Sequence, residues 1–205
     1  MNTENNKDLR LYMLLLGATP PGRHTEQHDF FFGIAGSLQE LVPSVRAFWP
    51  EAGERIHIDG WREVKMVDGY RIQVILKDQP WTGDQSKKLF FINLGGYQPN
   101  KLEEQHYTVL TVQEERGAAI AKSKETIFYR TNSTADPGGG SHIDDKYGID
   151  VDDVYEIEDI LSPELKEKYR ILVFPAGNLP EDEIHLGYLK LSKLLEKSPE
   201  RLNFN

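Results

Sequence analysis

The feature that most constrains this chain is an internal repeat: two blocks of sequence occur in both halves, in the same order. The first block aligns residues 11–29, LYMLLLGATPPGRHTEQHD, with residues 89–107, LFFINLGGYQPNKLEEQHY. The identical positions of this block pair Leu11, Leu16, Gly17, Pro21, Glu26, Gln27 and His28 with Leu89, Leu94, Gly95, Pro99, Glu104, Gln105 and His106. A chain that repeats its motifs in a fixed order is predicted to fold as two similar units.

The second block aligns residues 57–76 with residues 142–161. Here the motif HIDG that begins at His57 lies over the motif HIDD that begins at His142. The offset between the copies grows from 78 to 85 residues between the two blocks, so the second copy carries an insertion. We assign the insertion to the glycine-rich stretch 132–141, because lengthening a surface loop costs little free energy.

Each repeat is predicted to be a ββαββ unit. An apolar strand (11–16, 89–94), a turn and a second strand (28–34, 106–112) form a hairpin in each copy. A helix follows: SLQE at 37–40 fits a capping box ahead of Pro43, which kinks or restarts the helix, and acidic residues open the helix expected over 114–129. Two further strands are expected in each copy, around Ile58 and Ile72 and around Ile143 and Ile157.

The turn between the first two strands has the same chemistry in both copies. Pro21-Gly22 and Pro99-Asn100 both place proline before a residue that tolerates a positive φ, as a type II turn requires. Arg23 and Lys101 follow at the tips of the two hairpins, where they are candidates for an anion site, although solvated turn residues are the more frequent explanation.

The tail is not a third copy. SPELKEKY is predicted to form a capped short helix, RILVFP a strand, and residues 182–197 a strand that gives way to a helix after about Lys190. We therefore expect an α+β fold with mostly antiparallel sheets: repeat 1 over 9–77, repeat 2 over 88–161, and an extension over 162–205 that packs on them. Because a unit of about 70 residues has a marginal core, the repeats are expected to pack as an intramolecular pseudo-dimer.

Composition excludes several classes of site. The formal net charge is −9 and the pI is near 5.2, without a run of lysine or arginine, which disfavours nucleic-acid partners. The chain has no cysteine, so disulfides, thiolate metal sites and cysteine nucleophiles are excluded. The acidic run 144–159 lacks the ligand spacing of an EF-hand, which favours a solvated strand face over a calcium site.

The apolar run near the start, KDLRLYMLLLGA, resembles a weak signal peptide. An equivalent run occurs in mid-sequence, where a signal peptide cannot act, so we interpret both runs as core strands and expect a cytoplasmic protein. No stretch approaches the roughly 20 apolar residues that span a bilayer, and no membrane partner is expected.

The motifs HTEQHD, HIDG, LFFINLGGY, SHIDDKYGIDVDDVYEIEDIL and IHLGYLKLSKL together resemble a bacterial protein family, the domain of unknown function 1543 family. The resemblance covers most of the chain, and the family's domain occurs twice in some proteins. Because the family has no assigned activity, the resemblance implies a fold and a duplication but no chemistry.

The candidate site is the pairing of two motifs with i, i+2 spacing, which places two side chains on one face of a strand. In repeat 1 the residues are Glu26, His28, His57 and Asp59, and in repeat 2 they are Glu104, His106, His142 and Asp144. Two imidazoles and two carboxylates suit a divalent transition metal, with either His28, His57 and Asp59 or His106, His142 and Asp144 as the minimal ligand set. The same groups suit an acid–base pair, or hydrogen bonds that only support the fold.

Three classes of function follow. A cytoplasmic binding or interaction module would take a small molecule or a protein at duplicated polar sites, as a monomer or a homodimer. A metal-dependent or acid–base enzyme is the alternative, and a purely structural role for the repeated histidines is the third class. Repeat 1 is expected to carry the working site, because Asp29 adds a carboxylate there whereas repeat 2 has Tyr107.

Overall fold

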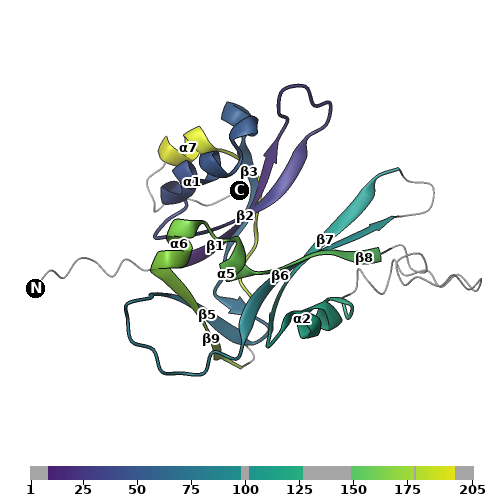
Figure 1. Cartoon of the computed structure of the whole chain (residues 1–205). Helices are drawn as coiled ribbons and strands as arrows, with labels where there is room; N and C mark the ends of the chain where they lie inside the picture. Colours follow the sequence, from purple (N-terminus) through teal and green to yellow (C-terminus); the bar gives the residue numbers. More distant parts are fainter. Residues whose placement is uncertain (1–8, 98–101, 127–148, 178, 197–205) are drawn as a thin grey trace, which may run out of the picture. The chain divides into compact units, whose positions relative to one another are not determined.

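A computed structural model describes residues 9–97, 102–126, 149–177 and 179–196. The chain divides into two compact units (Figure 1). Unit 1 combines the described residues of Met1–Pro80 and Leu161–Asn205, and unit 2 consists of those of Trp81–Ile160. The extension therefore belongs to the same unit as the first 80 residues. Both units combine mostly antiparallel sheets with a few short helices, which confirms the α+β class.

The main sheet of unit 1 has four strands in the order β10-β3-β1-β2, and every neighbouring pair is antiparallel. The strands are β1 (Arg10–Ala18), β2 (Gln27–Ala35), β3 (His57–Glu63) and β10 (His185–Lys190). The predicted hairpin is confirmed: Gly22 has a φ of 80°, and the Arg23 amide donates to the Pro20 carbonyl at 3.2 Å. This is the geometry that Pro21-Gly22 favours.

One face of this sheet carries the core. Alternate residues of β1, such as Leu14 and Leu16, are fully buried against the helical segments η1 (Gln39–Leu41), α1 (Val42–Phe48), η2 (Pro50–Arg55) and α7 (Leu191–Glu196). In Figure 1, α1 and α7 lie next to one another. Pro43 lies in the first turn of α1, where its missing N–H costs no hydrogen bond, so it starts the helix.

Unit 1 also has a three-stranded sheet in the order β4-β5-β9. It contains β4 (Met66–Val67), β5 (Tyr70–Leu76) and β9 (Tyr169–Pro175), and the β4–β5 turn is formed by Asp68 and Gly69, both with positive φ. The predicted strand around Ile72 thus exists, but it pairs with the extension rather than with β3. The predicted cap of α6 (Pro163–Lys168) is confirmed: Ser162 Oγ accepts from the Leu165 amide.

The sheet of unit 2 has the order β7-β6-β8, with β6 (Lys88–Tyr97), β7 (Glu104–Gln113) and β8 (Ile149–Glu156). The helix α2 (Arg116–Ser123) packs Ala119 onto this sheet, in a core that also contains Phe90, Ile92, Leu94 and Val154. The second hairpin is therefore confirmed, and the helix expected over 114–129 is shorter.

The expected strand around Ile157 is wrong. β8 ends at Glu156, and Ile157–Ile160 form the helix α5. Ile157 and Ile160 are three residues apart, a spacing that places both on one side of a helix but on opposite faces of a strand. The strand expected around Ile143 lies outside the described residues. Within the described part of the chain, no helix is both long enough and apolar enough to cross a membrane.

Candidate metal-binding site

Strand register brings the four candidate residues of repeat 1 together on the face of the main sheet opposite the core. Gly17 of β1 pairs with His28 of β2 on one side and with His57 of β3 on the other. Glu26 precedes His28 by two residues. Asp59 follows His57 by two residues, at a shift of the β1–β3 register that turns its side chain towards His57. Because side chains alternate between the two faces of a strand, these four residues meet on one face, as the sequence predicts.

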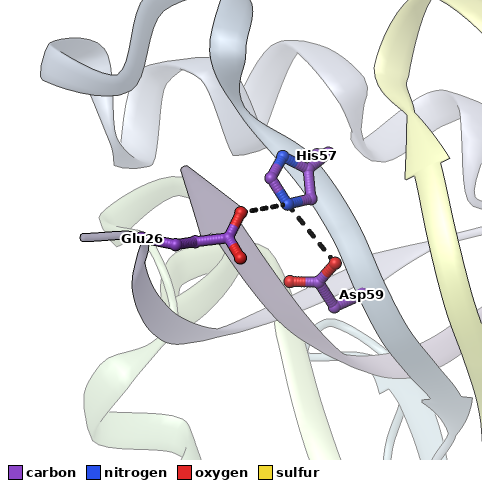
Figure 2. A group of neighbouring side chains, drawn as sticks. All are labelled: Glu26, His57 and Asp59. Carbon is purple, nitrogen blue, oxygen red and sulfur yellow. Dashed lines mark ion pairs between the residues drawn. The ribbon is translucent and has the colours of Figure 1, made fainter. Parts of the chain in front are cut away.

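The four side chains form one cluster, of which Figure 2 shows Glu26, His57 and Asp59. His57 Nε2 lies 3.0 Å from Glu26 Oε1 and 3.3 Å from Asp59 Oδ1. His28 Nε2 lies 3.3 Å from Asp59 Oδ2 and 3.6 Å from Glu26 Oε2. Glu26, His57 and Asp59 each offer a ligand atom within 4.8 Å of the others, whereas His28 lies at the rim with 46% of its side chain exposed.

His57 is the buried centre of the cluster, with 5% of its side chain exposed. Its Nδ1 lies 3.0 Å from the carbonyl oxygen of Arg55, which can only accept, so Nδ1 carries a proton and donates. In the neutral imidazole Nε2 is then a bare acceptor that faces two carboxylates. Both His57 Nε2 and Asp59 Oδ2 are buried without a hydrogen-bond partner. A cation between these atoms would satisfy them.

Gly17 provides the space at the centre of the cluster. A Cβ at this position would lie 2.5 Å from His57 Nε2 and closer still to Asp59 Oδ2. Any other residue would therefore displace the two side chains that the site needs. Gly95 holds the same position in unit 2, where a Cβ would collide with the carboxylate of Asp152.

The C-terminal strand β10 adds residues to the rim that sequence reasoning missed. Tyr188 packs its ring against His57, with ring centroids 4.3 Å apart and an interplanar angle of 39°. Lys190 pairs with His57 in the β3–β10 register. No local signal in the sequence connects these residues with the HIDG motif, because more than 120 residues separate them.

Unit 2 has a related cluster with different members. His106 Nε2 lies 3.7 Å from Glu104 Oε2, and His106 Nδ1 lies 3.4 Å from Asp152 Oδ2. The amide of Asn93 contacts both His106 Nδ1, at 3.3 Å, and Asp152 Oδ2, at 3.4 Å. This cluster therefore contains a side-chain amide where unit 1 has Leu15.

The register of unit 2 corrects the alignment of the second block. Gly95 pairs with Asp150, as Gly17 pairs with His57, and the register shifts between Asn93 and Leu94, as it does between Leu15 and Leu16. Asp150 and Asp152 are thus the counterparts of His57 and Asp59. His142 and Asp144, which the alignment proposed, lie outside the described residues.

An ion pair supports this corrected correspondence. Arg10 Nη1 lies 2.6 Å from Glu63 Oε1, and Lys88 Nζ lies 2.7 Å from Glu156 Oε2, at matching positions of the two sheets. The pattern Ile-x-Ile/Val-Asp-x-x-x-Glu begins at Ile56 and at Ile149, and it aligns β3 with β8 as the structure does. The identities between HIDG and HIDD favour a different alignment.

Two other candidates of repeat 1 stand apart from the cluster. Arg23 is exposed at the tip of the β1–β2 hairpin, and Lys101 lies outside the described residues. Asp29 does not add a carboxylate to the site, which contradicts the expectation from sequence. It pairs with Leu16, whose side chain is in the core, so Asp29 points to the face of β2 opposite to that of His28.

The comparisons with known proteins agree with this fold. The crystal structure of a protein Il1583 from Idiomarina loihiensis is similar, with a TM-score of 0.57 and 22% sequence identity over 90% of this chain and 99% of that chain. At this identity the likeness concerns the fold alone. No curated protein matches the sequence.

The family comparison covers the candidate site itself. Residues 23–74, which include Glu26, His28, His57 and Asp59, match the family model described as Domain of Unknown Function (DUF1543). This match confirms the family resemblance that the sequence motifs indicate. The segment that matches the DUF1543 family therefore contains all four residues of the cluster in unit 1.

Proposed function

We propose that unit 1 is a metal-binding domain that holds one divalent transition-metal ion between Glu26, His57 and Asp59, with His28 at the rim. The observation that carries the proposal is the buried Nε2 of His57. Two carboxylate oxygens lie 3.0 and 3.3 Å from it, yet it has no hydrogen-bond partner.

The alternative occupant of this space is a proton on His57 Nε2. A protonated Nε2 would donate a directional hydrogen bond to one carboxylate, and a buried donor is expected to be well aligned. The contacts of Nε2 lack that alignment, whereas a metal ion attracts several oxygen and nitrogen atoms from different directions. The bond from Nδ1–H to the Arg55 carbonyl is the arrangement that metal-bound histidines use to present Nε2.

The donor set indicates the class of ion. One or two imidazole nitrogens with two carboxylates suit Zn²⁺, Fe²⁺ or Mn²⁺, and the absence of cysteine removes the softer thiolate ligands. Three protein ligands, with His28 as a potential fourth, leave positions on the ion open to a further molecule. A binding module is the function that this geometry supports best. A metal-dependent or acid–base enzyme stays the alternative, for which the exposed imidazole of His28 is the available acid–base group.

We further propose that the two units arose by duplication and that unit 2 has lost the site. The shared strand order, the shared register shift and the repeated ion pair support the common origin. In the described part of unit 2 the position of His57 is held by Asp150, which offers no imidazole. Packing of the units as a pseudo-dimer stays a prediction.

The test is metal binding by the full chain after removal of metals with a chelator. Calorimetric titration with Zn²⁺ and with Mn²⁺ should give about one site per chain, and elemental analysis after dialysis should agree. His57→Ala should lose the site, whereas the matched variant His106→Ala should keep it. The proposal fails if the wild-type protein binds neither ion above the level of His57→Ala.

A further inference from the structure

The site of unit 1 opens beside one strand whose exposed residues share its face of the sheet. Leu186 pairs with Gly60 and Lys190 with His57, and Tyr188 lies between them with the same i, i+2 alternation. Residues 186, 188 and 190 of β10 therefore form a rim along the edge of the cluster, which we call the β10 rim. In Figure 2, β10 is the yellow strand that runs beside β3.

The β10 rim is apolar where it is nearest to the buried ligands. The ring of Tyr188 is held against His57 at 4.3 Å, yet 61% of the residue is exposed. Leu186 is 71% exposed, and its Cδ2 atom would lie 3.1 Å from a Cβ on Gly60, the residue next to Asp59. A fixed aromatic ring and an aliphatic side chain, both open to solvent, provide a flat surface for an apolar group.

The charge of the occupied site favours an anion. The two carboxylates of Glu26 and Asp59 balance a divalent ion, and the exposed Lys190 then adds a positive charge at the rim. Because a bound transition metal still has open positions, an anionic oxygen can complete its coordination while Lys190 compensates the charge.

We infer, on the basis of the proposed metal site, that unit 1 binds small aromatic carboxylates. The carboxylate binds the metal ion, Lys190 attracts its charge, and the ring lies on Tyr188 and Leu186. This arrangement separates the two ends of the ligand, since the metal recognises the acid and the β10 rim recognises the apolar body. An apolar segment of a protein could also lie on this rim, but it would not require the metal ion.

The experiment uses the full chain loaded with Co²⁺, whose visible absorption reports its coordination, and salicylate as the probe. Salicylate should change the Co²⁺ spectrum with saturation. Acetate, which has no ring, and benzamide, which has no charge, should each bind at least tenfold more weakly. Salicylate should not bind the metal-free protein.

Variants of the β10 rim identify the recognising residues. Tyr188→Ala and Lys190→Gln should each weaken salicylate binding roughly tenfold while Co²⁺ still binds, since an aromatic contact and a charge–charge attraction each contribute about that factor. Two control variants remove exposed residues elsewhere: Ile184→Ala, an aliphatic residue just before β10, and Tyr155→Ala, on β8 of unit 2, which is matched to Tyr188. Neither control should change salicylate binding.

The outcomes separate this inference from the metal site. If the wild-type protein fails to bind Co²⁺, the metal site is wrong and the inference falls with it. If Co²⁺ binds but salicylate leaves its spectrum unchanged, or if Tyr188→Ala and Lys190→Gln bind salicylate as the wild type does, the metal site stands and the inference is overturned.

Discussion

Asp182 and Arg62 form a nearly buried ion pair between the segment that leads into β10 and the end of β3. Asp182 Oδ2 lies 3.2 Å from Arg62 Nη2, and the two side chains are 5% and 12% exposed. The same oxygen accepts from the backbone amides of Lys65, at 2.7 Å, and Met66, at 2.9 Å. One carboxylate oxygen thus ties the start of the β10 segment to the turn after β3.

Replacing Asp182 should destabilise unit 1. Asp182→Ala leaves a guanidinium and two amides without their acceptor in a poorly solvated place, so the free energy of unfolding should fall by roughly 2–4 kcal/mol. Denaturant titration measures this change. Glu181→Ala, which removes an exposed carboxylate one residue earlier, is the control and should change stability by less than about 0.5 kcal/mol. Equal losses in the two variants would contradict a specific role for Asp182.

Gly17→Ala should weaken metal binding while the protein still folds. The new Cβ meets the ends of the Asp59 and His57 side chains rather than backbone, so those side chains can move aside at a cost of about 1–3 kcal/mol. The displaced ligands should then weaken Zn²⁺ binding at least tenfold, as measured by calorimetry. Gly95→Ala, which presses on Asp152 in unit 2, should leave the binding unchanged. A Gly17→Ala protein with wild-type affinity would show that the metal lies elsewhere.

Tyr12 should make stability fall at alkaline pH. Burial, with the nearby negative charge of Glu63, raises the pKa of the Tyr12 phenol from 10.0 to about 12. Because the folded state favours the neutral phenol, this stabilising contribution is complete below pH 10 and is lost as the pH rises through 12. Free energies of unfolding measured from pH 8 to 12 should therefore decrease less for Tyr12→Phe than for the wild type. Parallel decreases would refute the assignment.

Glu63 should contribute to loss of stability in acid. Burial alone would raise the pKa of the Glu63 carboxyl, but hydrogen bonds from Lys65 and Arg10 outweigh it and hold the pKa below its usual value of 4.5. The charged carboxylate of Glu63 therefore stabilises the folded state above pH 4.5, and this stabilisation is lost as the pH falls through the lowered pKa. Glu63→Gln should be less stable than the wild type at pH 7, and the difference should shrink below pH 4. A difference that does not vary with pH would indicate that packing, not charge, explains it.

Local patterns in the sequence predict much of this structure. Both hairpins follow from apolar runs joined by a proline-containing turn, and the change from strand to helix near Lys190 follows from a change in the period of the apolar residues. The meeting of Glu26, His28, His57 and Asp59 also follows from local rules, since i, i+2 spacing selects one face of each strand.

The parts that were not predicted depend on pairing between distant strands. The partner of β5 is β9, which lies in the extension, and the partner of β3 is β10, which brings Tyr188 to His57. The alignment of HIDG with HIDD was wrong for the same reason. Because one face of β8 is buried, the register of β8 on β6 is fixed, and Asp150 pairs with Gly95. An alignment by residue type places His142 at this position instead, since it is identical to His57.

Unit 1 is discontinuous, because Trp81–Ile160 separate its first 80 residues from the segments that complete it. During synthesis on the ribosome, all strands of unit 2 emerge before β9, β10 and α7. Until then β3 is an unprotected sheet edge, and the core of unit 1 lacks Leu189, Leu191 and Leu194. Unit 2 can therefore fold before the main sheet of unit 1 has received its last strand, β10. The proposed metal site would therefore be completed late, only after β9 and β10 have been synthesised.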